Sequence, residues 1–295
     1  MGAELDFLDH LELESARFAE AIGSAPPEAR VPSCPDWNAD DLLWHLAEVQ
    51  WFWGTVVRER ITDAPGDVAP ARPADRAGLA EFFDRGSREL ADVLAATPPD
   101  APAWPWSEDH TVGFIRRRQA HEALIHRVDA ELTTGRRTPM DPGLSADGVD
   151  EALRIMYGGV PPWGNFTPGG ETVRLRASDT GNTWLVATGR FTGTDPEGTL
   201  HDEPDIHAAG SDPGDPADAE IVGTAADLDC WLWHRPSYAP VIPSGDPDVL
   251  AHFESAIAPA STDHRARASQ RTPHQPQEVN GTTLENPPSP TYHDF

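Results

Sequence analysis

The chain has 295 residues and a formal net charge of -27 at pH 7, with 49 acidic residues against 22 basic ones. This length is enough for two domains, each with its own core. The acidity makes nucleic acid a poor partner, because phosphate binding needs a basic surface, and no apolar run approaches the roughly 18 residues of a membrane span.

Four stretches with helical periodicity occupy the first 140 residues, at 5–22, about 38–60, 75–96 and 111–133. Asn38 is predicted to cap the second of them, with Asp41 favouring the helix start three residues later. The Pro-rich residues just before Asn38 are predicted to form a turn. Four helices of this length with loops between them predict a four-helix bundle.

The pattern changes after a fifth predicted helix at 145–158. Alternating residues predict a strand pair, further strands and two closing helices, at 171–177, 183–188, 205–209, 219–222, about 224–234 and about 246–258. The sequence thus predicts a two-domain α+β protein. Its parts are a helical bundle over 1–140, a small α+β domain over 141–260 and a disordered, Pro-rich tail over 261–295.

Polar residues interrupt the inward face of the fourth predicted helix. Glu122 and His126 are four residues apart, so they lie one above the other. Arg118 and Asp129 fall on the same face, and in the second helix His45 lies among apolar neighbours. A carboxylate facing inward is costly unless it is paired or bound to a metal.

Two explanations of these residues remain open on pattern alone. A buried histidine is commonly a hydrogen-bonded core residue, and a Glu–His pair four residues apart is commonly an exposed helix pair. Alternatively, His45, Glu122 and His126 are suitable ligands for zinc or a similar divalent ion, and three protein ligands leave one coordination position open, as in catalytic zinc sites. Asp129 would then orient a histidine ligand.

Two segments carry a family resemblance, VPSCPDWNADDLLWHLAEV (31–49) and RRRQAHEALIHRVDAEL (116–132). They resemble the two motifs of the mycothiol-dependent maleylpyruvate isomerase family, which belongs to the DinB-like metal-dependent helical bundles. The resemblance covers about residues 5–258. It implies that the three candidate ligands bind zinc or another divalent metal and that mycothiol is the thiol cofactor or co-substrate. All 22 basic residues are arginine, which agrees with a GC-rich, actinobacterial source.

A third segment, DLDCWLWHRP (227–236), resembles a family helix that ends in an arginine facing a cleft. Arg235 matches that arginine, although His234 stands where a small residue is usual. The resemblance implies that Arg235 binds substrate or thiol through a bidentate pair with a carboxylate. The alternative is an arginine that interacts with the helix dipole. In the run 116–118, we expect Arg118 to face the cofactor and the other two arginines to be solvated.

The expected function is a zinc-dependent, mycothiol-using cis–trans isomerisation of a small electrophilic acid. Two alternatives stay open: a mycothiol S-transferase of specialised metabolism or detoxification, and a non-catalytic metal- or ligand-binding protein. Only two cysteines are present, Cys34 and Cys230, so no disulfide framework is expected. We expect a cytoplasmic monomer or small homo-oligomer without nucleic-acid or membrane partners, whose cysteines serve packing.

Overall fold

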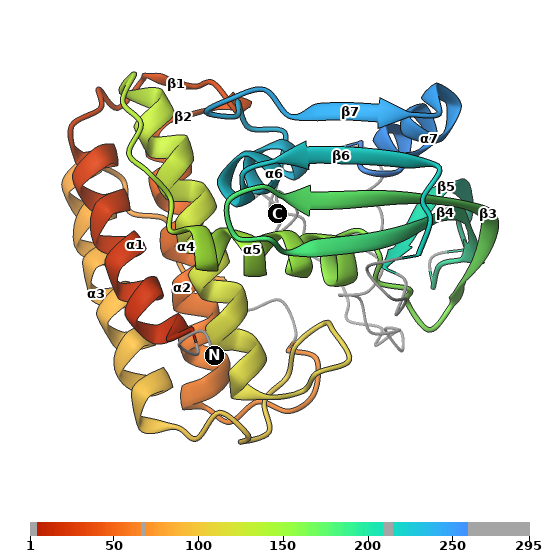
Figure 1. Cartoon of the computed structure of the whole chain (residues 1–295). Coiled ribbons are helices and arrows are strands. Elements are labelled where there is room, and N and C mark those ends of the chain that lie inside the picture. Colours follow the sequence, from red (N-terminus) through yellow and green to blue (C-terminus); the bar gives the residue numbers. More distant parts are fainter. Residues whose placement is uncertain (1–4, 66–68, 197, 209–214, 259–295) are drawn as a thin grey trace. The chain divides into compact units, whose positions relative to one another are not determined.

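The computed structural model describes residues 5–65, 69–196, 198–208 and 215–258 (Figure 1). Its helices are α1 (Phe7–Gly23), α2 (Ala39–Arg58), α3 (Arg76–Ala96), α4 (Val112–Thr133), α5 (Pro142–Glu151), α6 (Ala225–Leu232) and α7 (Pro247–Ala256). Its strands are β1 (Arg30–Val31), β2 (Cys34–Asn38), β3 (Gly164–Ala177), β4 (Thr183–Thr194), β5 (Leu200–Ala208), β6 (Ala219–Gly223) and β7 (Ile242–Gly245). Among these helices, none is long and apolar enough to span a membrane. The tail predicted over 261–295 lies outside the described residues.

The chain divides into two compact units, and neither is continuous in sequence. The first unit holds the chain up to Glu151 together with Arg176–Asn182 and Val222–Ile242. The second unit holds Ala152–Leu175, Thr183–Ile221 and the chain from Pro243 onward. The predicted fold class, a helical bundle followed by an α+β part, is confirmed. The domain boundaries at residues 140 and 260 stay predictions.

Helices α1 to α4 lie side by side in the first unit (Figure 1). Their contacts give the order α1–α4–α2–α3 around the bundle. The apolar core includes Phe18, Leu46 and Phe83, which are at most 2% exposed. Burial of each such side chain contributes about 1.5–3 kcal/mol, so packing of this core holds α1, α2 and α3 together.

The start of α2 is set by a complete capping box. The Asn38 side chain accepts hydrogen bonds from the backbone N–H groups of Asp40 and Asp41, and the Asp41 carboxylate accepts one from the Asn38 N–H. The predicted cap is therefore confirmed. The segment before it does not form only a turn, because β1 and β2 pair antiparallel with Val31 opposite Cys34. These strands are too short to show an alternating pattern.

A five-stranded sheet has the order β5-β4-β3-β6-β7. Strands β4 and β5 are antiparallel, with Val186 opposite Ala208 and Thr194 opposite Leu200. Strands β3 and β4 extend beyond the predicted 171–177 and 183–188. The added part of β3 is mostly exposed, and the added part of β4 contains Gly189 and Gly193, a residue type that is depleted in strands. Strand β7 was not predicted, since all four of its residues are exposed.

The helix predicted over 145–158 is two pieces in the structure. Helix α5 begins at Pro142, a residue type favoured in the first helical turn, and its start is capped by the Asp141 carboxylate. A π-helical turn over Ala152–Met156 then ends it, with the Tyr157 N–H bonded to the Ala152 carbonyl at 2.9 Å.

The buried carboxyl of Asp229 on α6 leads to a stability prediction. Neither of its oxygens has a hydrogen-bond partner among the described residues. Gly148 of α5 packs against it, so that a Cβ at Gly148 would lie 2.8 Å from an Asp229 oxygen. Burial, reinforced by the charge of Glu151, raises the pKa of Asp229 well above its usual range.

A raised pKa means that the folded state disfavours the ionised carboxylate, so Asp229 lowers stability as pH rises above its unfolded pKa of about 4. We expect Asp229→Asn to increase the free energy of unfolding at pH 8 by about 1–3 kcal/mol. The gain should vanish near pH 4. Urea unfolding at both pH values measures this, and an equal gain at both would contradict the explanation.

Candidate metal site

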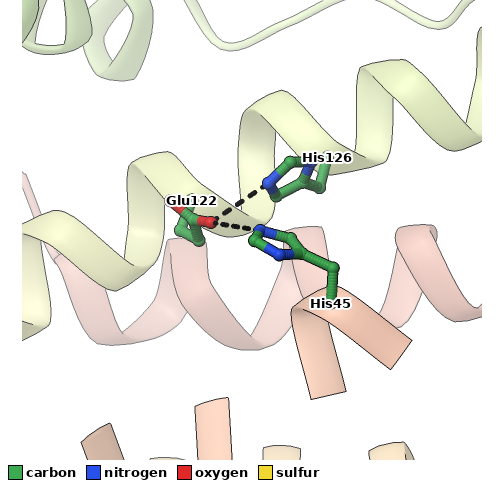
Figure 2. A group of neighbouring side chains, drawn as sticks. All are labelled: His45, Glu122 and His126. Atoms are coloured by element: carbon green, nitrogen blue, oxygen red, sulfur yellow. Dashed lines mark hydrogen bonds and ion pairs between the residues drawn. The ribbon is translucent and has the colours of Figure 1, made fainter. Parts of the chain in front are cut away.

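His45, Glu122 and His126 converge within the first unit (Figure 2). His45 projects from α2, and the other two residues project from α4. The Nε2 atoms of His126 and His45 lie 3.0 Å and 3.4 Å from the same Glu122 oxygen, Oε1. All three candidate ligand atoms lie within 4.8 Å of one another. The structure thus brings together the three residues that the sequence singled out.

The three side chains form a charged cluster inside the bundle, with residue exposures of at most 9%. Burial alone would raise the pKa of Glu122, but His126, a hydrogen bond from His45 and the charge of Arg118 hold it well below the usual range. Burial alone would lower the pKa of His126, but Glu122 and Asp129 raise it to about 9. Without a metal, the protonated His126 imidazole and the Arg118 guanidinium therefore balance the Glu122 charge.

Asp129 connects the cluster to Arg235. Its carboxylate is fully buried and accepts a hydrogen bond from Nδ1 of His126 at 2.9 Å. Arg235 donates two more, from Nε at 3.0 Å and from Nη2 at 2.8 Å. The Ser33 hydroxyl donates a further one. Because Asp129 engages Nδ1, the Nε2 atom of His126 is left directed at Glu122, the arrangement usual for metal-binding histidines.

Arg118 holds the other oxygen of Glu122. Its Nη2 donates to Glu122 Oε2 at 2.9 Å, and its Nη1 donates to the Glu151 carboxylate. The guanidinium also lies over the Trp233 ring, 5.7 Å from the centroid. Arg118 is therefore buried within the network of the site. Its predicted contact with the cofactor stays a prediction.

The expectation that the neighbouring arginines are solvated is wrong. Arg116 donates to two carbonyls at the end of α3, and Arg117 pairs with Asp147 of α5 at 2.7 Å. His121 also turns away from Glu122 and bonds Asp147 at 2.8 Å. Asp147 is 30 residues from Arg117, so no helical spacing in the sequence connects these two residues.

The β1–β2 hairpin covers one side of the cluster. The ring of Trp37 lies 4.7 Å from that of His45 and 6.4 Å from that of His126, centroid to centroid. The Cys34 sulfur lies 3.9 Å from Nη2 of Arg235. The sequence predicted a turn in this segment and a packing role for Cys34, and the bond between Ser33 and Asp129 was missed because 96 residues separate them.

The donor set fits a divalent cation. Two imidazoles and one carboxylate suit zinc and similar borderline ions. They form the one group of three or more His, Cys, Asp or Glu residues with this proximity in the part of the chain that the structure describes. The carboxylate is ionised, and the bond from Asp129 presets which His126 nitrogen would face the ion.

Metal affinity should depend steeply on pH. His126 carries a proton in the metal-free protein below its pKa of about 9, and a metal binds only the neutral ring. Uptake should therefore release a proton, and affinity should rise about tenfold per pH unit from about pH 7 until it levels off near pH 9. Zinc titration against a competing chelator across this range tests it, and a flat profile would contradict it.

Comparisons with known proteins bear on both units. A family model described as the mycothiol maleylpyruvate isomerase N-terminal domain matches residues 8–131, and one described as the MDMPI C-terminal domain matches residues 143–252. Two similar crystal structures are of mycothiol-dependent maleylpyruvate isomerase, at 14% identity with a TM-score of 0.47, and of a histidine-to-alanine mutant of that enzyme, at 12% and 0.49. Each similarity covers 81% of this chain and 92% of the other. No curated protein matches the chain.

Proposed function

Because the chain belongs to the mycothiol-dependent maleylpyruvate isomerase family, we propose that it is a thiol-dependent metalloenzyme that isomerises a small electrophilic acid. The observation that carries the proposal is the convergence of His45, Glu122 and His126 on one point, backed by Asp129. Zinc is the proposed metal and mycothiol the proposed thiol.

The charges and hydrogen bonds of the residues around the proposed metal position favour binding of an anionic thiol. A divalent cation bound there would lower the pKa of a thiol so that the thiolate is present near neutral pH. Glu122 is the one carboxylate among the three ligands, so the set neutralises only half of a doubly charged ion. Arg118 and Asp129 hold Glu122 and His126 in fixed orientations, which limits the reorganisation needed when the thiol arrives.

The proposed reaction transfers no atoms between the thiol and the acid overall. The thiolate sulfur adds to one carbon of a cis double bond that a carbonyl group activates, and the double bond becomes a single bond. Rotation about that bond and loss of the thiolate give the trans isomer and return the thiol unchanged. The protein's part is to hold sulfur and double bond close together, where positioning alone gives large rate gains.

Arg235 is the residue proposed to contact the acid. Asp129 anchors it through two hydrogen bonds, and the Trp233 carbonyl accepts a third at 2.7 Å, which fixes the plane of the guanidinium. Its side chain is still 12% exposed. An anchored, partly exposed guanidinium suits the recognition of a carboxylate.

Zinc-loaded protein incubated with mycothiol and maleylpyruvate is expected to form the trans isomer while the thiol concentration stays constant. Chromatography of both compounds measures this, and omission of mycothiol is the control. Loss of thiol into a stable adduct would favour the S-transferase alternative. Absence of any thiol-dependent product from a panel of cis-enoyl acids, despite bound metal, would contradict the proposal.

A further inference from the structure

Glu48 lies on the face of α2 that carries His45. Positions 41, 45, 48 and 52 are spaced four, three and four residues apart, so their side chains line one face of the helix. Asp41, at the N-terminal end of this stripe, accepts a hydrogen bond from Arg72 at 2.9 Å. Glu48 stands about one turn beyond His45, where Cβ atoms are about 5–6 Å apart.

Glu48 is a largely buried residue, with 9% of its surface exposed. Within the described ranges no group donates a hydrogen bond to its carboxyl, whose oxygens are not fully enclosed by protein atoms. Burial raises the pKa of Glu48 to about 7, against the opposing charge of Arg72. Arg72 gives its hydrogen bond to Asp41 instead.

Other buried glutamates of the bundle, unlike Glu48, accept hydrogen bonds from arginines. Glu14 accepts a hydrogen bond from Arg127 at 2.7 Å, and Glu122 accepts one from Arg118 at 2.9 Å. A buried carboxyl left unpaired destabilises a fold. Such a group beside a candidate metal site is more readily explained by a ligand that supplies the missing donors than by packing.

We propose that Glu48 binds the thiol co-substrate by accepting hydrogen bonds from hydroxyl or amide groups of its sugar-linked body. This inference rests on the proposed function. Above pH 7, where Glu48 is ionised, Asp41 and Glu48 carry two negative charges against the one positive charge of Arg72, so this edge of the site favours an uncharged, donor-rich group over an anionic acid. A thiol whose sulfur reaches His45 and its neighbours would extend its body along the same helix face.

Steady-state kinetics and thermal unfolding of Glu48→Ala and Glu48→Gln test the assignment. Loss of hydrogen bonds to a carboxylate should raise the KM for mycothiol about 10- to 100-fold in Glu48→Ala and less in Glu48→Gln, which keeps an acceptor oxygen. Metal content and the KM for the acid should not change. The melting temperature of the ligand-free protein should rise by about 2–4 °C, because the unpaired carboxyl is gone.

Glu89→Ala is the matched control, since Glu89 is an exposed glutamate of α3 paired with Arg58 at 3.8 Å. An unchanged KM for mycothiol in Glu48→Ala would overturn the assignment and leave the proposed function standing. A lower melting temperature with both KM values raised would also overturn it, because that is the pattern of a structural residue. If the unaltered protein neither binds nor uses mycothiol, the proposed function and this inference both fall.

Discussion

Alanine at His45, Glu122 or His126 is expected to remove the metal and to lower turnover at least about a thousandfold. Each residue supplies one of three donors that lie within 4.8 Å of one another, so losing one leaves too few to hold the ion in competition with water. A bound cation contributes several kcal/mol to stabilising charge in the transition state, and about 4 kcal/mol corresponds to a thousandfold. Atomic emission and initial rates measure the two effects.

Two controls separate loss of metal from loss of structure. His110→Ala removes an exposed histidine just before α4 and should keep full metal content. Glu122→Gln preserves the shape of the side chain, while Glu122→Ala leaves the buried Arg118 with a missing partner and should also reduce stability. Wild-type activity in a well-folded, metal-free His126→Ala protein would contradict the assignment.

Replacing Asp129 is expected to weaken the site without removing a ligand. Asp129→Ala deletes the buried acceptor for Nδ1 of His126 and for two of the hydrogen bonds of Arg235. We expect zinc affinity to fall about 10- to 100-fold. The free energy of unfolding should fall by about 3 kcal/mol, since one partner of a buried ion pair is gone. Chelator competition and urea unfolding measure these quantities.

Asp129→Asn is the conservative variant for the same position. It keeps one acceptor oxygen but loses the charge that stabilises Arg235 and the imidazole, so zinc affinity should lie between those of the wild type and Asp129→Ala. Thr133→Val, one turn further along α4, is a suitable control because, among the residues that the structure describes, its hydroxyl donates to the Asp129 backbone carbonyl alone, at 2.9 Å. Unchanged zinc affinity in both Asp129 variants would show that the residue is not needed to orient His126.

Much of the bundle could be predicted from sequence because helical periodicity and caps are local properties. The Asn38 capping box is one example. The candidate ligands were harder to interpret, since a second polar cluster shows a similar inward pattern. There, Arg127 is fully buried between Glu14 and Glu131, at 2.7 Å and 3.1 Å, and Glu14 also pairs with Arg17 at 3.1 Å, so two arginines balance two glutamates. Periodicity alone does not distinguish a closed ion-pair network from a metal site.

Contacts between distant positions were beyond sequence reasoning. Ser33 and Asp129 are 96 residues apart, and Arg235 and Asp129 are 106 apart, so no spacing rule connects them. The family resemblance pointed to Arg235 through its motif but not to the bond with Asp129. Short or exposed strands such as β7 were missed for a different reason, because their residues carry no alternation.

The first unit is built from three separate stretches of the chain, which limits where the protein can be truncated or recombined with a relative. A gene fragment that stops at residue 140 would still encode all three candidate ligands, yet it would lack Val222–Ile242 and therefore Arg235. Asp129 would then face His126 without its cationic counterpart. If Arg235 and the three candidate ligands have the proposed roles, a domain swap between relatives at one crossover point should yield chimeras impaired in both metal affinity and recognition of the acid.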